Sequence, residues 1–261
     1  MHIDFYKYQG TGNDFILLDN FSGKYDALTV FQISQLCDRR FGIGADGLIK
    51  INKDEESDFE VEYFNADGSK SFCGNGARCS VRFVNEHLFK RDSYTFNAID
   101  GFHEAQLEGK NVSLEMKDVS EIENGENGSY ILETGSPHYI KFESDIKEKD
   151  IVEFGKSIRY NDYYREIGIN VNLVEKVNDT SLKIRTYERG VEDETLSCGT
   201  GITAAAIAHS SSKKMTGDVH IFVESMGGDL EVKFYSENGT DFRNIRLIGP
   251  AEFVFKGSIN V

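Results

Sequence analysis

Two stretches of this chain carry the same pattern and decide its fold: FCGNGARCSVRFVN at residues 72–85 and SCGTGITAAAIAHS at residues 197–210. Each opens a helix-like run with Cys-Gly-x-Gly. Each is followed by two strand-like segments joined by a glycine turn, YTFNAIDGFHEAQ (94–106) and IFVESMGGDLEVKF (221–234). A motif that recurs with matching neighbours indicates a duplicated structural unit. We therefore predict an α+β fold of two pseudo-symmetric halves, each a mostly antiparallel wrap of strands around a central helix.

The remainder of the chain supplies the other strands and helices. In the first half, apolar periodicity predicts an amphipathic helix within 28–40 and strands at 3–10, 14–19, 47–51 and 59–65. In the second half it predicts a helix over 148–160 and strands at 168–177, 181–188, 219–235 and 244–259.

The stretch 117–130 is rich in Glu, Asn, Gly and Ser and has no apolar period. We therefore place a boundary there, with an N-terminal half of residues 1–117 and a C-terminal half of residues 118–249.

The composition narrows the classes of function. A formal net charge of −15 argues against nucleic acid and anionic membranes as partners, because both are bound by clustered Lys and Arg. The N-terminus has no basic start followed by an apolar run, and no apolar stretch approaches the length of a membrane span. The four cysteines show no C-x-x-C spacing, so we expect no zinc site and reduced thiols in a cytoplasmic protein.

The paired Cys-Gly-x-Gly motifs suit acid–base chemistry at a carbon next to a carboxylate. A helix N-terminus carries unpaired N–H groups and partial positive charge, which favour a thiolate and bind carboxylates. With two such termini on one substrate, one thiolate would take the Cα proton and the other thiol would return a proton to the opposite face. We predict these roles for Cys73 and Cys198. The plainer interpretation, a cysteine buried for packing, we keep for Cys37 and Cys79, which lie on apolar helix faces.

Two glycine-rich stretches raise a dinucleotide-binding interpretation. GIGADG (42–47) fits G-x-G-x-x-G, and GTGITA (199–204) fits a variant of it. The first follows a helix and precedes a strand, the reverse of the dinucleotide order, and an acidic loop at 188–197 separates the second from its strand. We interpret both as tight turns and expect no nucleotide and no metal. We also expect no pyridoxal phosphate, since no lysine stands out as a Schiff-base residue.

Taken together, the motifs resemble the diaminopimelate epimerase family over essentially the whole chain. The matching stretches are GTGNDF (10–15), RRFGIGADGL (39–48), FNADGS (64–69), CGNGAR (73–78), GSPH (135–138), YERG (187–190) and ETLSCGTG (194–201). The resemblance implies an isomerase without cofactor that interconverts LL- and meso-2,6-diaminopimelate on the route to lysine and peptidoglycan precursors. It also implies a small amino-acid substrate, a cytoplasmic homodimer, and a last strand, in 250–261, that returns to the first half.

The resemblance also assigns roles to individual residues. Cys73 and Cys198 would be the two acid/bases, in agreement with the interpretation from the residues alone. Glu188 and His138 would lie near the thiols and assist their proton transfers, and Arg189 would pair with the distal carboxylate. The other implied substrate contacts are the backbone amides of Gly74, Asn75, Gly199 and Thr200, and the side chains of Asn13, Asn65, Asn170, Ser136 and Glu188.

The sequence departs from the family pattern at two positions and in one loop, YERGVEDETLSC (187–198), which is one residue longer between the Glu-Arg pair and the cysteine than in some members. Other functions also stay open. Ser136 stands where the best-known pattern has asparagine, and Gly47 where some members have glutamine. Proline racemases share the architecture, but Asn75 replaces the histidine of their motif, and Arg189 suits a second carboxylate. A protein that binds carboxylates without turnover is the alternative from another class, although it would not need the thiols.

The implied contact residues also have plainer interpretations. Asn13 and Asn65 lie in turns where asparagine is favoured for backbone reasons, and His138 follows a proline in a loop. Glu188 and Arg189 could form an exposed ion pair.

Overall fold

The computed structural model describes all 261 residues and divides into two compact units. Unit 1 consists of Met1–Leu114 together with Gly249–Val261, and unit 2 consists of Glu115–Ile248.

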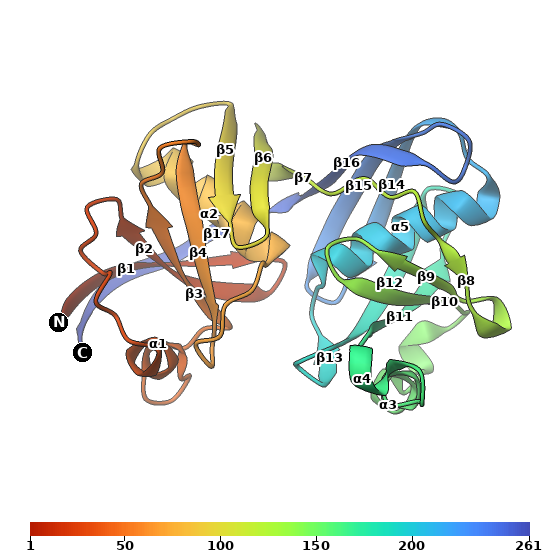
Figure 1. Cartoon of the computed structure of the whole chain (residues 1–261), viewed down its shortest axis with the longest axis horizontal. Helices are drawn as coiled ribbons and strands as arrows, with labels where there is room; N and C mark the ends of the chain where they lie inside the picture. Colours follow the sequence, from red (N-terminus) through yellow and green to blue (C-terminus); the bar gives the residue numbers. More distant parts are fainter. The chain divides into compact units, whose positions relative to one another are not determined.

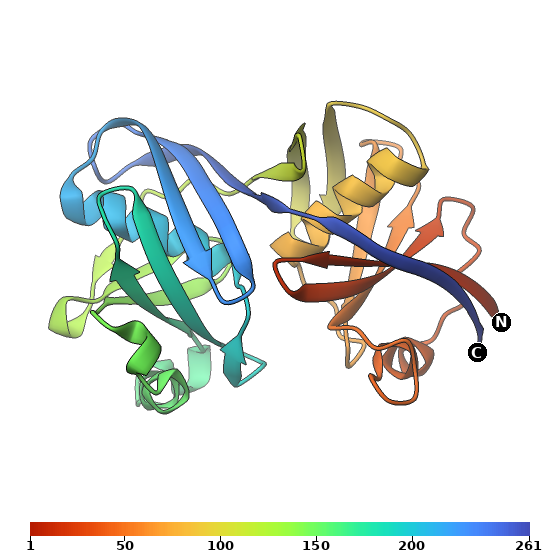
Figure 2. The same cartoon turned by 180° about the vertical axis from the view of Figure 1, so that it is seen from behind.

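Unit 1 contains eight strands and two helices. The strands are β1 (His2–Gly10), β2 (Asn13–Asn20), β3 (Gly47–Asn52), β4 (Phe59–Asn65), β5 (Ser93–Ala98), β6 (Gly101–Glu108), β7 (Asn111–Glu115) and β17 (Glu252–Asn260), and the helices are α1 (Val30–Cys37) and α2 (Gly74–His87). The last strand, β17, pairs antiparallel with β1, so the two ends of the chain lie side by side (Figures 1 and 2).

Unit 2 contains nine strands and three α-helices. The strands are β8 (Glu123–Asn124), β9 (Tyr130–Glu133), β10 (Pro137–Phe142), β11 (Asn170–Lys176), β12 (Ser181–Glu188), β13 (Asp193–Thr195), β14 (Gly217–Ser225), β15 (Gly228–Ser236) and β16 (Phe242–Pro250). The helices are α3 (Ile151–Arg159), α4 (Tyr164–Ile167) and α5 (Gly199–Lys213), with short 3₁₀ turns at Glu126–Gly128 and Ile146–Glu148.

The two units repeat one strand topology. In unit 1, β1 pairs antiparallel with β2, β2 parallel with β3, β3 antiparallel with β4, β4 parallel with β5, and β5, β6 and β7 follow antiparallel. In unit 2 the same order of pairings runs through β9, β10, β11, β12, β14, β15 and β16. The long helix follows the fourth strand in both series. The predicted α+β fold with two pseudo-symmetric halves is therefore confirmed.

Each long helix is the centre of its unit. Helix α2 packs against β1, β2, β3, β4, β6 and β17, and α5 packs against β9, β10, β11, β12, β14 and β15 (Figures 1 and 2). Helix α5 is buried from Gly201 to Ser210, with Ala204, Ala205 and Ala206 fully enclosed. A helix that is enclosed on every side needs no polar face, and alanine side chains let the strands approach its backbone closely.

The smaller helices cover the outside of the strands. Helix α1 begins at a capping box, in which Thr29 Oγ1 accepts from the N–H of Gln32 and Gln32 Oε1 accepts from the N–H of Thr29. It packs Ile33 and Leu36 into a core with Ile16 and Leu48. In unit 2, α3 packs on β11 and β12, where Gly155 lies directly against the ring of Tyr187.

Most predicted elements are present, but some of their limits differ. The helix expected within 28–40 ends at Cys37, because Asp38 Oδ1 accepts from the N–H groups of Arg40 and Phe41 and forms a turn there. Strands β9 and β10 have no counterpart among the predicted elements. These strands are short and lie beside Gly135 and Pro137, which disguised their apolar pattern.

Two further expectations concern the buried cysteines and the apolar character of the helices. Cys37 and Cys79 are buried, as predicted. None of the helices has the length and apolar character needed to cross a membrane.

Candidate functional site

Both motif cysteines occupy the residue immediately before a central helix. Cys73 precedes α2 with φ −137° and ψ 113°, and Cys198 precedes α5 with φ −115° and ψ 107°. These extended conformations are those of N-cap residues, which place the side chain beside the unpaired N–H groups of the first turn. The N–H of Gly76 donates to Cys73 Sγ at 3.5 Å. The predicted position of both thiols at a helix N-terminus is confirmed.

In unit 1, two asparagine side chains lie beside Cys73. The Sγ atom lies 3.6 Å from Asn13 Oδ1, which also accepts from Asn75 Nδ2 at 3.3 Å. Asn13 Nδ2 donates to Asp46 Oδ2 at 2.5 Å. The geometry therefore brings Asn13 and Asn75, both predicted as contact residues, next to the thiol.

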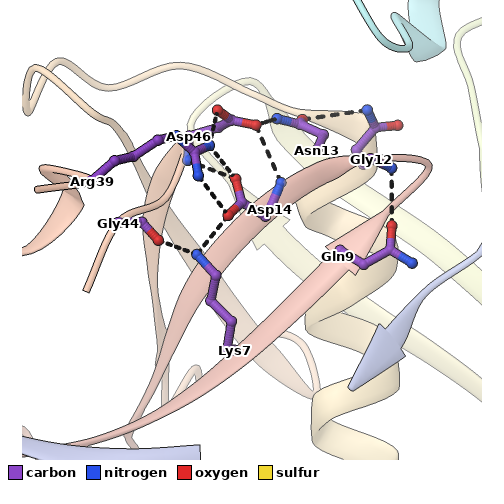
Figure 3. A network of polar contacts seen from close by, with 9 residues as sticks. Lys7, Gln9, Gly12, Asn13, Asp14, Arg39, Gly44 and Asp46 are labelled. Atoms are coloured by element: carbon purple, nitrogen blue, oxygen red, sulfur yellow. Dashed lines mark hydrogen bonds and ion pairs between the residues drawn. The ribbon is translucent and has the colours of Figure 1, made fainter. Parts of the chain in front are cut away.

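Behind Asn13 lies a network of charged groups that the sequence analysis missed (Figure 3). Arg39 donates to Asp14 at 2.6 and 3.1 Å and to Asp46 at 2.7 Å, and buried Lys7 lies 2.7 Å from Asp14. Burial works against the charge of Asp14, but the hydrogen bonds from Arg39 and Lys7 outweigh it and lower the pKa of Asp14 to about 2. Asp14 is thus held as a carboxylate, and the oxygens of Asp46 accept from Arg39, from the N–H of Asp14 and from Asn13.

A buried arginine holds Asn75 from the other side. Arg78 is fully buried, and its Nη2 donates to Asn75 Oδ1 at 2.9 Å and to Thr11 Oγ1 at 3.3 Å. Its Nε and Nη1 are buried without a hydrogen-bond partner. Burial lowers the pKa of this guanidinium, although an arginine remains charged even so. The motif CGNGAR contains Arg78, but the sequence offered no sign that its side chain points into the unit.

Asn65 has a local role in this structure. It ends β4, and its Nδ2 donates to the carbonyl and hydroxyl of Ser69 and to Ser71 Oγ, at 3.0–3.1 Å. These bonds fix the turn that leads to Cys73. A contact between Asn65 and substrate stays a prediction.

In unit 2, Cys198 is linked to a buried histidine through a threonine. Cys198 Sγ lies 3.4 Å from Thr200 Oγ1, and Thr200 Oγ1 lies 2.8 Å from His138 Nε2. Burial, with a smaller contribution from the charge of Arg189, lowers the pKa of His138 to about 3. His138 is therefore a neutral imidazole at physiological pH.

Two residues that the sequence analysis did not single out hold His138 in place. Asn172 Nδ2 lies 3.1 Å from His138 Nδ1 and donates to the carbonyl of Tyr139 at 3.1 Å. Asn172 Oδ1 accepts from Thr186 Oγ1 at 2.9 Å. Helix α5 packs tightly on this group at Gly201, where an added Cβ would lie 2.6 Å from Asn172 Oδ1 and 3.2 Å from His138 Cε1.

The residues implied for the distal end of a substrate form a second cluster in unit 2. Asn170 Nδ2 donates to Ser136 Oγ at 2.6 Å, and Asn170 Oδ1 accepts from the backbone N–H of Arg189 at 2.8 Å. The Arg189 side chain is exposed, and its Nη1 donates to the carbonyl of Ile167 at 3.3 Å. Glu188 Oε2 accepts from Thr195 Oγ1 at 2.9 Å. Thr195 lies three residues before Cys198 in the chain. Ser136, Asn170 and Arg189 are thus brought together.

GIGADG (42–47) is a turn, as interpreted from the sequence, whereas the same interpretation of GTGITA (199–204) is wrong, because these residues form the start of α5. GIGADG follows α1 and precedes β3, which is the reverse of the dinucleotide order. An added Cβ at Gly42 would lie 2.1 Å from the carbonyl oxygen of Gln35, and Gly44 has φ +81°. Glycine is needed at position 42 because a side chain would collide with the backbone of Gln35, and at position 44 because the backbone is left-handed there.

Comparison with known proteins identifies the family. The family model described as diaminopimelate epimerase matches residues 5–122 and 130–254. The chain belongs to the diaminopimelate epimerase family. It is 49% identical over 256 residues to the diaminopimelate epimerase of Flavobacterium psychrophilum, covering 97% of this chain and 99% of that protein. It is 38% identical to the diaminopimelate epimerase of Chlorobaculum tepidum, again covering 97% and 99%.

Solved structures at low identity share the fold. A Bacillus anthracis phenazine biosynthesis protein of the PhzF family has a TM-score of 0.76 at 16% identity and covers the whole of both chains. A hydroxyproline epimerase from Agrobacterium vitis has a TM-score of 0.68 at 13% identity, covering 99% of this chain and 92% of that one. These likenesses extend over both units of the chain.

Proposed function

We propose that this chain interconverts LL- and meso-2,6-diaminopimelate by proton transfer at the α-carbon, with Cys73 and Cys198 as the two acid/bases. Two findings support this activity: the chain belongs to the diaminopimelate epimerase family, and the relatives that it matches are named diaminopimelate epimerase. The observation that carries the assignment of the bases is the repeat itself. Each unit places one cysteine, followed by Gly-x-Gly, at the N-terminus of its central helix.

The mechanism follows from these helix ends. The N–H groups of Gly74 and Asn75 on α2, and of Gly199 and Thr200 on α5, are in the first helical turns and have no intrahelical acceptor. In the proposed complex they hold the α-carboxylate and stabilise the negative charge that develops when the weakly acidic Cα–H is removed. One thiolate takes that proton while the other thiol supplies a proton to the opposite face. No cofactor is used.

The residues around the thiols then divide by role. We assign Arg189 to the distal carboxylate, because its exposed guanidinium can form a forked pair, and Asn170 and Ser136 to the same end of the substrate. Asn13 and Asn65 are proposed contacts in unit 1, and Glu188 is proposed to assist Cys198 and to bind an ammonium group.

His138 supports Cys198 in a different way from the one implied by the family resemblance. A histidine with a pKa of about 3 is a poor proton acceptor at neutral pH, so we propose that His138 holds Thr200 as a neutral hydrogen-bond donor.

The deciding experiment is incubation of reduced protein with LL-diaminopimelate in deuterium oxide without added cofactor. We expect α-deuterium in the amino acid and formation of the meso isomer. Cys73→Ser and Cys198→Ser should each abolish epimerisation, with Cys79→Ser as the matched control at a buried thiol. Absence of both exchange and product from the reduced wild-type protein would refute the proposal. Exchange with L-proline instead would assign it to a racemase of the same fold.

We further propose a cytoplasmic homodimer. Reduced thiols are required for the mechanism, and such thiols are maintained in the cytoplasm; all four cysteines are free in this structure. Strand β17 supports self-association because Phe253, Val254 and Phe255 are all about half exposed on it. Sedimentation equilibrium of the wild type and of Phe253→Glu tests this, and a monomeric wild type at micromolar concentration would exclude the dimer.

A further inference from the structure

The side chains beside the two thiols are hydrogen-bond neighbours of opposite kind. Beside Cys73 lies the oxygen of an amide, Asn13 Oδ1, and beside Cys198 lies a hydroxyl group, Thr200 Oγ1. An amide oxygen can only accept, whereas a hydroxyl can donate. Whether each neighbour donates a hydrogen bond to the thiol or accepts one from it depends on the groups that contact that neighbour from the other side.

In unit 1 the direction is fixed from both ends. Arg78 can only donate, so the Asn75 atom that it contacts is Oδ1, and Asn75 Nδ2 must point to Asn13. Asp46 Oδ2 also accepts from the backbone N–H of Asp14, so it acts as an acceptor here and the Asn13 atom that it contacts is Nδ2 (Figure 3). Both constraints place Asn13 Oδ1 toward Cys73, where it accepts the S–H of a protonated thiol.

In unit 2 the direction is fixed by a backbone carbonyl. Asn172 Nδ2 faces the carbonyl of Tyr139, which can only accept, so the same NH₂ group also donates to His138 Nδ1. The single proton of the neutral imidazole is therefore on Nε2, which donates to Thr200 Oγ1. The hydroxyl proton of Thr200 is then directed to Cys198 Sγ, where it stabilises a thiolate.

We propose that these two hydrogen-bond chains set the thiols in opposite protonation states before substrate binds, with Cys73 as the thiol and Cys198 as the thiolate. Asp46 and Arg78 are positioning residues for Cys73 through Asn13, and Asn172 and His138 are positioning residues for Cys198 through Thr200. This deepens the proposed function and rests on it, since a two-base inversion needs one base and one acid at the start of each turnover.

Other charges act on the thiols as well. Both cysteines lie at the positive end of a helix. Cys73 Sγ also accepts from the N–H of Gly76 at 3.5 Å, which favours a thiolate there, whereas Cys198 makes no such cap hydrogen bond. On α2, Arg78 and Cys79 interact electrostatically with Cys73. The Arg78 cation favours a thiolate at Cys73 and so narrows the difference between the two thiols, although its hydrogen bonds go to Asn75 and Thr11.

Two charged groups lie near the supporting residues of unit 2. Glu188 accepts from Thr195, and the charge of Arg189 acts on His138. A carboxylate close to Cys198 would oppose a thiolate there, and a guanidinium would favour it.

The test is the pH dependence of alkylation of the substrate-free, reduced, full-length protein by iodoacetamide. Quantitative peptide mass spectrometry follows Cys73 and Cys198 in the same sample. The midpoint of each rate profile reports protonation independently of how accessible each thiol is. Cys37 and Cys79 do not interfere, because burial raises the pKa of Cys37 to about 12 and raises that of Cys79 as well. We expect Cys198 to titrate at lower pH and to react roughly tenfold faster than Cys73 at neutral pH.

Two variants test the hydrogen-bond chains themselves. Thr200→Val removes the donor and should move the Cys198 profile up by roughly one pH unit, whereas Thr200→Ser keeps the hydroxyl and should leave it in place. Asp46→Asn releases the constraint on Asn13 and should move the Cys73 profile down.

The proposal fails if Cys73 titrates at or below Cys198 in the wild type, or if Thr200→Val leaves the Cys198 profile unchanged. If Thr200→Val does not fold, the order of the Cys73 and Cys198 midpoints in the wild type still tests the proposal. These measurements need no substrate. Expected profiles without deuterium exchange would therefore refute the proposed function alone, and exchange without the expected profiles would refute only this inference.

Discussion

Replacement of Gly201 by alanine tests how closely α5 must approach the residues that support Cys198. The added Cβ would lie 2.6 Å from Asn172 Oδ1, 3.2 Å from His138 Cε1 and 3.4 Å from His138 Nδ1. None of these atoms is the free end of a flexible side chain, because Asn172 is bonded to Thr186 and to the carbonyl of Tyr139. The helix must therefore shift, or the contact between Asn172 and His138 must open.

The size of the effect can be estimated. Alanine in place of glycine favours a helix by up to about 1 kcal/mol, and overpacking of a tight site costs about 1–3 kcal/mol. Because the contact of 2.6 Å is far inside van der Waals distance, we take the upper part of the overpacking cost, about 2–3 kcal/mol. After the helix gain, Gly201→Ala should lower the free energy of unfolding by roughly 1–2 kcal/mol, a fall in Tm of roughly 2–6 °C in a chain of this size. Displacement of Thr200 by a fraction of an ångström to 1 Å should reduce kcat on the order of 10²-fold.

Unit 1 offers a matched control for this change. Gly76 occupies the equivalent third position of α2, where an added Cβ would meet the terminal methyl of Ile49 at 3.1 Å and Cys73 Cβ at 3.6 Å. The methyl group can move, so Gly76→Ala should destabilise the protein less than Gly201→Ala. Thermal unfolding and steady-state epimerisation of both variants are the assays. A Gly201→Ala protein with wild-type stability and kcat, or a Gly76→Ala protein that is the less stable of the two, would refute the reasoning.

Three further predictions concern charge. The pKa of Asp14 is lowered to about 2 from 3.8, so its contribution to stability is present above about pH 4 and is lost as the pH falls toward 2. Denaturant unfolding of Asp14→Asn should therefore show a smaller loss of stability than the wild type over that range. The pKa of His138 is lowered from 6.5 to about 3, so the unfolded chain binds a proton that the folded chain does not. The wild type should therefore lose stability relative to His138→Gln as the pH falls from about 6.5 toward 3, and parallel curves would contradict the buried neutral imidazole. Arg189→Lys should raise KM for diaminopimelate more than tenfold with a smaller effect on kcat, since a single ammonium cannot form the forked pair, and an unchanged KM would remove Arg189 from the distal site.

The elements that lie next to each other in the chain were predictable. The N-terminal positions of Cys73 and Cys198, the turn glycines and the repeat of strand, helix and hairpin all depend on neighbouring residues and on apolar periodicity. Strands β9 and β10 were missed because they are only four and six residues long, with Gly135 between them and Pro137 at the start of β10. The candidate contact residues came from the family resemblance, and each of them still needs its test.

The sequence by itself determined a duplicated α+β fold and the presence of one thiol at the start of each central helix. Only the tertiary structure decided which atoms surround those thiols. Asp46 reaches Asn13, and Asn172 reaches His138, because strand pairing joins segments 33 and 34 residues apart. Such partners leave no local pattern, since the direction of a hydrogen bond is set by donors and acceptors that come together only when the strands close around the helix.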